Sequence, residues 1–443
     1  MPIITPEYNL YNWSDLNFPT IEPSLRLDFA NARALDPRIT FTRASVGTYV
    51  DANGLIKTAG EDEARFDHDP ATGESLGLLI EESRTNYQTY SVDINTGKSF
   101  LTGSTLSSNV AIAPDGTTTA TRITGSGIDE ITRLGWNTQG TSNTQYNLFS
   151  VFVKANSGTP ILGFYSNTFV AGAVAFNIDL SDGSTNTISG SGSFSSKVVA
   201  YPNGWYRVTV MGGPGTGSSG SWNINLVPSL TSERGSQSGS NASASYFIWG
   251  VQEELTKSGF FPTSYIPTNG STVTRAVEYA YSDTNGFLNP EAGTIISKFK
   301  WLDLSTPGTF GKVLYSFNQS TGGFGNGIYI SNEPLQTATN FKVMSGSSAV
   351  AAEALLQLGQ DPAELNIAIG YETNNVGFCE GGGSISEDTS ADIPNIERLV
   401  IGNNAWGNGV GGSNGSNPAN CHIKSFIYYP KRLANAQLKA LTQ

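Results

Sequence analysis

The sequence is poor in the residues that most metal and redox sites require. It has two histidines and two cysteines among 443 residues, which excludes a His-rich or Cys-rich metal site by number alone. Charged residues make up 14%, too few for a coiled coil or a strongly charged disordered chain. The 25 basic residues are outnumbered by 37 acidic ones, so a net charge of −12 gives no general attraction to nucleic-acid phosphates. We therefore expect no nucleic-acid partner.

Long apolar runs and export signals are missing too. No stretch of 18 consecutive apolar residues occurs, so we expect no membrane insertion. The first ten residues, MPIITPEYNL, lack a basic region followed by an apolar stretch and do not predict a secretory signal. Glycine is abundant instead: its 50 residues are about 11% of the chain against a usual ~7%, and aromatic residues make up 11%. High glycine, many aromatic residues and few charges indicate an all-β protein of extracellular type.

The N-terminal 40 residues differ from the rest of the chain. They are rich in proline and show no sustained hydrophobic period, yet they contain large rings that would be costly to expose, namely Tyr8, Tyr11, Trp13 and Phe18. We interpret residues 1–40 as an extended anchoring arm that buries these rings on a partner or a neighbouring subunit. The alternative is a strand-like extension folded back on its own chain.

The remaining residues predict two β-sandwiches in tandem. Residues 41–86 contain short strands and turns and form a small β segment of their own. Residues 87–280 contain short strands at regular spacing with Gly- and Ser-rich turns, which is typical of a jelly-roll sandwich. We expect a linker at 281–289 and a second antiparallel β-sandwich at 290–443.

Two segments of the last sandwich have a pattern that differs from a strand. Residues 433–441 (LANAQLKAL) have apolar residues at helical spacing and predict a short closing helix. Residues 350–358 fit either a helix or a strand, and their alanine and leucine content favours the helix.

Three sets of motifs carry a resemblance to known families. The first set resembles a recurrent segment of bacteriophage head-spike and tail-fibre proteins, and it comprises 41–45 (FTRAS), 48–51 (TYVD), 53–54 (NG), 63–67 (EARFD) and 77–86 (GLLIEESRTN). The second set resembles the carbohydrate-binding-like jelly roll that usually follows in those proteins, and it comprises 114–120 (PDGTTTA), 203–208 (NGWYRV), 248–253 (IWGVQE), 263–268 (TSYIPT) and 274–276 (TRA). The third is similar to the end of a laminin-G or concanavalin-like domain, with 399–402 (LVIG), 423–429 (IKSFIYY) and the closing helix.

The resemblance implies a structural protein of a phage particle, a head spike or a tail fibre. Such a protein forms homotrimers, contacts other virion proteins through residues 1–40 and displays lectin-like modules that attach to host-surface glycans. It assembles in the host cytoplasm and ends on the virion surface, which fits the absence of a predicted export signal. The alternatives are a glycan-degrading tailspike enzyme and a capsid decoration protein without a ligand.

Several tryptophans are candidates for stacking on a sugar ring. Those in polar or glycine-rich surroundings are suited to a shallow site between loops, and neighbouring amides would add donors and acceptors. These candidates are Trp136, Trp222 and Trp406, with Asn403 and Asn404. The alternative is that the rings cover one end of a sandwich core. Trp205 and Trp249 lie within apolar strands and are predicted core residues.

We expect no enzymatic activity. A glycosidase needs two carboxylates that face one bond, and adjacent residues such as Glu253 and Glu254 point to opposite faces of a strand. The pair Glu81 and Glu82 is adjacent in the same way. Asp67 and Asp69 have suitable spacing, but acids beside a proline more often cap turns. A Ser–His–Asp set would need His68 or His422, and no Gly-x-Ser-x-Gly turn occurs in a strand–helix context.

We also predict no cofactor, with calcium as an alternative. The acids available in the last sandwich are Asp303, Asp361, Glu387, Asp388 and Asp392, and their spacing matches no known calcium loop. Cys379 and Cys421 are either a disulfide between neighbouring strands or two buried free thiols.

Overall fold

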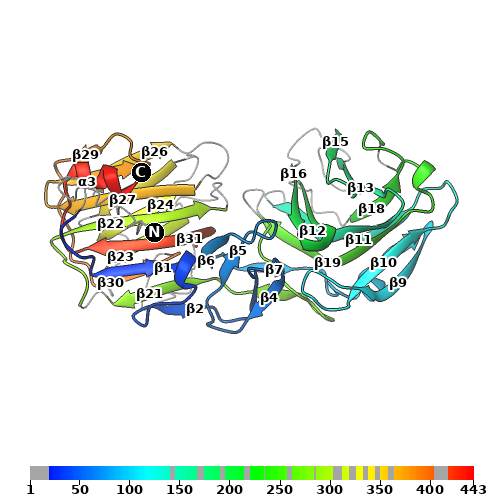
Figure 1. The fold of residues 1–443 in the computed structure, drawn as a ribbon, viewed down its shortest axis with the longest axis horizontal. Coiled ribbons are helices and arrows are strands. Elements are labelled where there is room, and N and C mark those ends of the chain that lie inside the picture. Colours follow the sequence, from blue (N-terminus) through cyan, green and yellow to red (C-terminus); the bar gives the residue numbers. More distant parts are fainter. Residues whose placement is uncertain are drawn as a thin grey trace, which may run out of the picture.

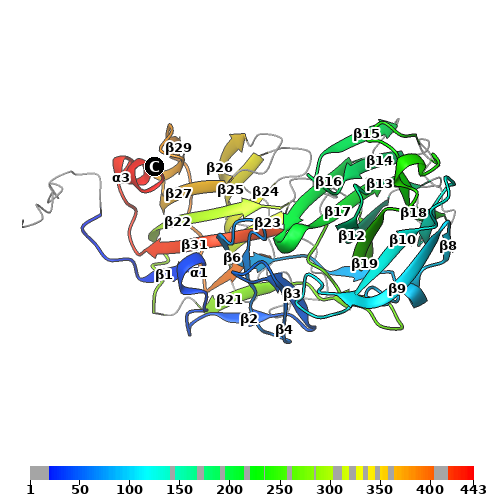
Figure 2. The same ribbon diagram turned by 45° about the vertical axis from the view of Figure 1, so that its right-hand side comes forward.

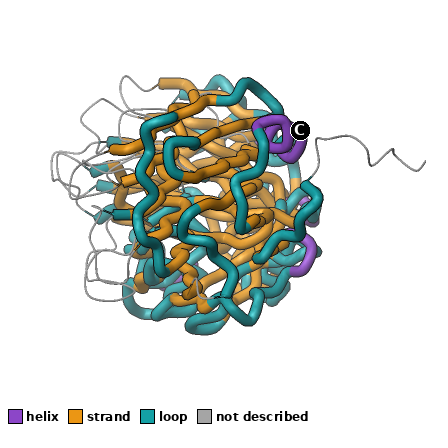
Figure 3. Tube along the Cα trace, turned by 90° about the vertical axis from the view of Figure 1, so that its left-hand side faces the viewer, coloured by secondary structure: helices purple, strands orange, loops and turns teal. Residues whose placement is uncertain are grey.

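The computed structural model describes residues 19–139, 145–166, 174–189, 195–213, 220–233, 235–256, 262–283, 286–302, 312–318, 326–332, 338–344, 350–357, 364–403 and 418–443. Within these residues, strands dominate and form two antiparallel β-sandwiches that lie side by side (Figures 1 and 2). Figure 3 shows how few helices accompany the strands. The prediction of an all-β fold with two antiparallel sandwiches is confirmed.

The first sandwich combines the two ends of the chain, and we call it the split sandwich. One of its sheets runs in the order β5 (Phe66–His68), β6 (Ser75–Ile80), β31 (Cys421–Tyr429), β22 (Ala292–Trp301), β27 (Glu364–Glu372), β28 (Val376–Glu380) and β29 (Ser386–Asp388), with β1 (Leu25–Asp28) also paired to β31. The facing sheet runs in the order β2 (Thr40–Thr42), β21 (Tyr279–Asp283), β30 (Arg398–Ile401), β23 (Lys312–Asn318), β24 (Gly327–Asn332), β25 (Ala338–Met344) and β26 (Val350–Gln357).

The second sandwich is formed by the middle of the chain, and we call it the inserted sandwich. One sheet runs in the order β16 (Ser195–Tyr201), β17 (Trp205–Gly212), β12 (Tyr146–Ser157), β19 (Ser245–Thr256), β10 (Ala120–Gly125) and β9 (Ser104–Ala111). The other runs in the order β15 (Thr185–Ser189), β14 (Val174–Asp179), β13 (Ile161–Ser166), β18 (Ser221–Val227), β11 (Arg133–Asn137) and β8 (Phe100–Thr102).

Alternation along β12 explains how its sheet is buried on both faces. Phe149, Val151 and Val153 point into the core between the two sheets of the inserted sandwich. Phe152 points the other way and packs with Trp205, Trp249 and other rings in a separate apolar cluster. Trp205 and Trp249 are buried, so their prediction as core residues is confirmed.

The connection between the sandwiches differs from the predicted tandem order. The chain enters the inserted sandwich through β7 (Arg84–Asn86) and leaves it through β20 (Val273–Arg275), and these two strands pair as an antiparallel neck. The predicted separate segment 41–86 therefore belongs to the split sandwich and the neck, apart from a hairpin of β3 (Gly47–Val50) and β4 (Ile56–Ala59). The predicted linker at 281–289 is also wrong at its start, because β21 is an inner strand of a sheet.

The prediction of an anchoring arm is wrong for residues 19–40. β1 pairs with β31, and Leu25 and Leu27 are buried in the core of the split sandwich. Pairing with the chain's own last strand satisfies the backbone groups and buries the side chains, so this part needs no partner. The rings of Tyr8, Tyr11, Trp13 and Phe18 lie outside the described residues.

Helices are short and peripheral. Those of the described residues are α1 (Phe29–Ala32), α2 (Ile94–Gly97) and α3 (Asn435–Leu441), with 3₁₀ turns at Pro202–Gly204 and Gly239–Asn241. The predicted closing helix is confirmed by α3, whose Leu438 packs on the split sandwich. The preference for a helix at 350–358 is wrong for residues 350–357, which pair with β25 as strand β26. Among the described residues no helix has the length and hydropathy needed to cross a membrane.

Candidate functional site

Two of the predicted sugar platforms are core residues. Trp136 is 0% exposed and Trp222 is 1% exposed. The two tryptophans are cross-strand partners, and each packs on Phe149 with ring centroids 5.5 and 5.7 Å apart. The Trp222 indole Nε1 donates a hydrogen bond to Asn147 Oδ1 at 2.7 Å. Neither ring can stack on a sugar, because both fill the space between the two sheets.

The third predicted platform, Trp406, has one of its neighbouring amides among the described residues. Trp406 and Asn404 lie outside the described residues. Asn403 is described and is 5% exposed, and its backbone carbonyl accepts a hydrogen bond from Ser316 Oγ. A side chain this deeply buried does not suit contact with a glycan, so the prediction for Asn403 is wrong.

The acids considered for calcium do not converge. Asp303 and Asp361 lie outside the described residues. Glu387 accepts a hydrogen bond from Asn435, and Asp388 Oδ1 caps the turn at Ser390. In the part of the chain that the structure describes, Asp392 included, no three Asp, Glu, His or Cys side chains are placed to hold a metal ion. The two cysteines, Cys379 and Cys421, are buried free thiols rather than a disulfide.

The carboxylates considered for catalysis have structural partners. Glu253 accepts a hydrogen bond from the Gln139 backbone nitrogen at 2.7 Å, whereas Glu254 accepts one from the Thr263 backbone nitrogen at 3.2 Å. The two carboxylates thus turn to different neighbours, as the strand alternation predicts. Burial raises the pKa of Glu253.

The aspartates considered with them are also engaged. Asp67 Oδ2 lies 2.8 Å from His422 Nε2, and Asp67 Oδ1 accepts a hydrogen bond from the Val50 backbone nitrogen at 2.7 Å. Asp69 accepts hydrogen bonds from the backbone nitrogens of residues 71 and 72, so it caps a turn, as its place before a proline predicts. These contacts tie the β3–β4 hairpin and its neighbouring turn to the split sandwich.

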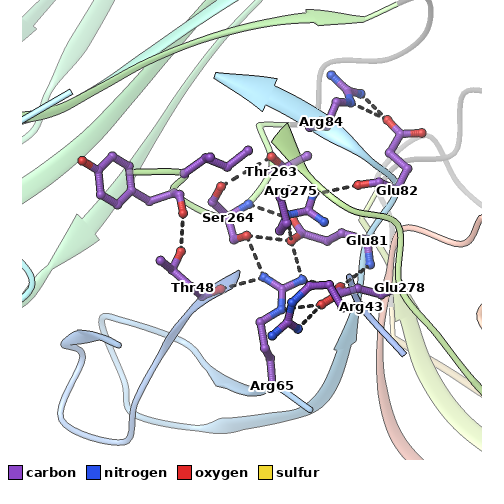
Figure 4. Close-up of polar contacts among 12 residues, drawn as sticks. Arg43, Thr48, Arg65, Glu81, Glu82, Arg84, Thr263, Ser264, Arg275 and Glu278 are labelled. Carbon is purple, nitrogen blue, oxygen red and sulfur yellow. Dashed lines mark hydrogen bonds and ion pairs between the residues drawn. The ribbon is translucent and has the colours of Figure 1, made fainter. Parts of the chain in front are cut away.

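Four charged residues of the first two motif sets, Arg43, Arg65, Glu81 and Arg275, come together with Glu278 in one buried cluster beside the neck (Figure 4). Arg43 Nη1 and Arg65 Nε each donate to Glu278 Oε1 at 2.7 Å. Arg65 Nη2 donates to Glu81 Oε2 at 2.7 Å, and Arg275 Nε lies 3.5 Å from the same oxygen. All five side chains are at most 1% exposed. Residues far apart in the sequence therefore share one closed ionic network.

This ionic cluster also reaches the segment that packs on the inserted sandwich. Ser264 donates to Glu81 from its backbone nitrogen at 2.8 Å and from its hydroxyl at 2.7 Å. Burial alone would raise the pKa of Glu81, but the charges of Arg275 and Arg65 and the Ser264 hydrogen bonds lower it to about 2. The carboxylate is therefore ionised and fully paired. This closed cluster connects the two sandwiches and has no opening through which a ligand could enter.

An open hollow of about 400 Å³ lies between β15 and β16, the edge strands on the same side of the two inserted sheets. Figure 1 shows both strands at the upper side of the inserted sandwich. Its volume is within the range of ~300–1,000 Å³ that small-ligand sites have. Its lining residues are Phe176, Asp182, Gly183, Thr185, Ser196, Lys197, Val198, Ala200 and Tyr206.

Tyr206 supplies an aromatic ring to this hollow. Its neighbour Trp205 packs on the apolar cluster of Phe152, and strand alternation turns Tyr206 to the opposite face, where it is half-buried. Among the described residues none hydrogen-bonds to the Tyr206 hydroxyl. Gly183 has φ +78°, and a Cβ there would lie 2.8 Å from Tyr206 Cε1. Only glycine lets the turn between β14 and β15 approach the ring so closely.

Polar groups surround the ring. Asp182 is exposed, and its hydrogen bonds with Ser184 lower the pKa of its carboxyl, which keeps it ionised. The Thr185 and Ser196 side chains add hydroxyl groups to the lining. A half-buried ring beside a carboxylate and hydroxyls can hold a sugar, whose C–H face packs on the ring while its hydroxyls donate to the carboxylate.

The apolar pattern around Trp205 predicts the strand that carries Tyr206, but it does not mark Tyr206 as part of a site. Its position beside a core tryptophan places it on the opposite face of the strand. The missing information was the sheet order: β17 lies next to the edge strand β16, where the ring packs against the core but stays partly exposed.

A scan against protein-family models and a search of curated proteins find no match to this chain. Solved structures similar to parts of it include the CBM40 domain of Ruminococcus gnavus IT-sialidase bound to alpha2,6 sialyllactose, at 16% identity over 34% of this chain and 84% of that chain, with a TM-score of 0.26. The CBM22-1-CBM22-2 tandem domain of Paenibacillus barcinonensis Xyn10C is 12% identical over 79% of this chain and 99% of that chain, with a TM-score of 0.25. Domains LG4-5 of the mouse laminin alpha1 chain are 11% identical over 68% and 86%, with a TM-score of 0.22. At these identities and TM-scores the likeness assigns neither a family nor a ligand to this chain.

Proposed function

We propose that this protein is a glycan-binding adhesion protein whose ligand occupies the hollow between β15 and β16. One observation carries the proposal: a half-buried tyrosine ring with an unpartnered hydroxyl, among the described residues, lines an open hollow together with the ionised Asp182 carboxylate. The proposal concerns binding without hydrolysis, since the carboxylates considered for catalysis have structural partners.

The proposal extends to a place on a bacteriophage particle, as a subunit of a head spike or tail fibre. What supports this part is the resemblance of the motifs within 41–86 and 114–276 to such proteins. The buried ionic cluster supports it physically, because an adhesion module under load needs a firm attachment to its support. Self-association, contact with other virion proteins and a virion-surface location belong to the same proposal. Light scattering of the purified protein and immunolabelling of particles test it, and an unlabelled particle would contradict it.

The glycan part is tested on an array of bacterial lipopolysaccharide and capsule fragments. We expect Tyr206→Ala to lose binding at least tenfold, which corresponds to about 1.4 kcal/mol, and Tyr206→Phe to keep most of it, because the ring remains. Tyr87→Ala, which removes a half-buried tyrosine outside the hollow, is the matched control. Equal binding by all variants would contradict the proposal, and release of new reducing ends from the fragments would contradict its restriction to binding.

A further inference from the structure

We propose that the split sandwich carries a second saccharide-binding surface, at Glu372. Two open hollows of about 430 and 600 Å³ share this residue, and together we call them the Glu372 groove. The smaller hollow is lined by the start of α3, which lies at the end of the molecule away from the inserted sandwich (Figures 1 and 2). The groove is therefore separate from the Tyr206 hollow. The inference rests on the proposed function only for the class of ligand, a saccharide.

The carboxylate at the centre of the groove is held in place. Glu372 ends β27, and a tight turn returns the chain to β28, with the Asn375 backbone nitrogen donating to the Glu372 carbonyl at 3.0 Å. Asn375 Nδ2 also donates to Glu372 Oε1 at 2.6 Å. Among the described residues none donates to Oε2, so this oxygen is available to a ligand.

A buried arginine fixes the floor of the smaller hollow. Arg432 is 9% exposed and lies against two glycines of neighbouring strands, Gly370 and Gly377. A Cβ at Gly377 would lie 2.4 Å from Arg432 Nη2, so the close approach depends on glycine. The same Nη2 donates to Asn435 Oδ1 at 2.6 Å, which holds one wall in place. A site whose walls are fixed in this way binds with little loss of side-chain entropy.

The groups that face the groove match a polyhydroxylated ligand. Lys431 is exposed, and no partner for its ammonium group is found in the described parts of the chain. Glu372 offers a carboxylate oxygen, and Thr373 and Asn395 add a hydroxyl and an amide to the larger hollow. A sugar hydroxyl both donates and accepts, so a diol between an ammonium group and a carboxylate satisfies both.

Two alternatives fit the groove less well. An apolar ligand would leave its charged groups desolvated without partners. A polyanion would meet Lys431 and Arg432 in the smaller hollow, but in the larger one it would meet two carboxylates, Glu372 and Glu291, and no cation among the lining residues. Because the two hollows meet at one residue, a chain of sugars can occupy both, with successive units on either side of Glu372. We therefore assign the groove to an uncharged oligosaccharide rather than to a single sugar.

The experiment measures binding of full-length protein to uncharged bacterial O-polysaccharides and to their acid-hydrolysis fragments of increasing length. The parent for this comparison is Tyr206→Ala, in which the first site is disabled. We expect it to retain binding that strengthens with fragment length, and we expect Glu372→Gln or Lys431→Gln in that background to weaken it at least tenfold. Glu74→Gln, an exposed carboxylate of the same sandwich outside the groove, is the control, and melting temperatures report on folding.

The outcomes separate this inference from the proposed function. Loss of all binding in Tyr206→Ala overturns the groove and supports the first site. Binding that is unchanged by Tyr206→Ala but is lost on Glu372→Gln supports the groove and overturns the first site. Binding that does not depend on fragment length, or that survives both groove substitutions, overturns the groove. An absence of binding to every O-polysaccharide and fragment also overturns it.

Discussion

Removing the charge of Glu278 tests whether the buried ionic cluster holds the molecule together. Its carboxylate accepts hydrogen bonds from Arg43, from Arg65 and from the backbone nitrogen of Glu81, and it is 0% exposed. The substitution Glu278→Gln keeps the size of the side chain and removes one negative charge. Three buried arginines then face the single carboxylate of Glu81, and the new amide nitrogen meets donors where the oxygen met them.

The expected loss of stability follows from this burial. Breaking a buried ion pair by removing one partner costs ~3–5 kcal/mol, because the remaining charge is left desolvated without compensation. An exposed pair contributes only ~0–1 kcal/mol, since water and salt screen it. Glu74 makes such a pair with Lys424 at 2.6 Å, and its side chain is 63% exposed. Glu74→Gln therefore makes the same chemical change in a solvated setting.

Urea unfolding followed by tryptophan fluorescence compares the two variants with the unmodified chain. Trp301 is buried in the split sandwich, and Trp136, Trp222 and Trp249 are buried in the inserted one, so the signal reports on both. We expect a loss of about 3 kcal/mol or more for Glu278→Gln and less than about 1 kcal/mol for Glu74→Gln. A loss below about 1 kcal/mol for Glu278→Gln, or equal losses for both variants, would refute the reasoning.

Three further predictions follow from single features of the structure. The folded-state pKa of Glu81, about 2, is below the ordinary 4.5, so the ionised carboxylate stabilises the fold above pH 4.5. This contribution of about 3 kcal/mol is lost as the pH falls through 2. The midpoints of urea unfolding between pH 6 and 2 check this prediction, and a midpoint that rises on acidification would contradict it. Gly183→Ala forces a Cβ into the Tyr206 ring of the first hollow, whereas Gly204 has the same φ of +78° and a Cβ there meets nothing within 4 Å. Both substitutions strain the backbone in the same way, so we expect only Gly183→Ala to abolish glycan binding. Equal binding by the two variants on a glycan array would contradict the role of the turn. Both thiols should resist a thiol reagent at pH 8 in the native protein and react in denaturant, because they are buried, and prompt native labelling would contradict the burial of Cys379 and Cys421.

Local patterns predicted the elements of the fold but not the way the chain connects them. The apolar strands predicted around Trp205 and Trp249 are realised in β17 and β19, and the helical spacing over 433–441 is realised in α3. Hydrophobic periodicity describes the two faces of one strand and contains no information about its partner. The pairing of β1 with β31, near opposite ends of the sequence, therefore had no local signal. The insertion of one sandwich into the other also had no local signal, because a neck of two three-residue strands is too short to show a hydrophobic pattern.

Two of the three predicted sugar platforms are wrong for a related reason. Trp136 and Trp222 have polar neighbours in the sequence, and polar neighbours suggest a loop. The structure places the two rings on paired strands, with polar Arg133 and Asn137 exposed at the two ends of β11. A short strand of a sandwich can thus bury a large ring within two residues of solvent. Exposure depends on the sheet that covers a residue, and that sheet comes from elsewhere in the sequence.

The burial of the motif residues shows which part of the structure the motifs specify. Arg43, Arg65 and Glu81 belong to the first motif set, and their side chains are closed off from any ligand in the ionic cluster. Arg207, in the second set, donates to the Thr263 carbonyl at 2.9 Å and is likewise structural. In the first hollow, Tyr206 comes from a motif, whereas Asp182 comes from a turn outside all of them. We therefore expect proteins that share these motifs to share the junction between the two sandwiches. Their ligands should differ wherever the turns beside the ring differ, because those turns supply the polar groups that a glycan contacts.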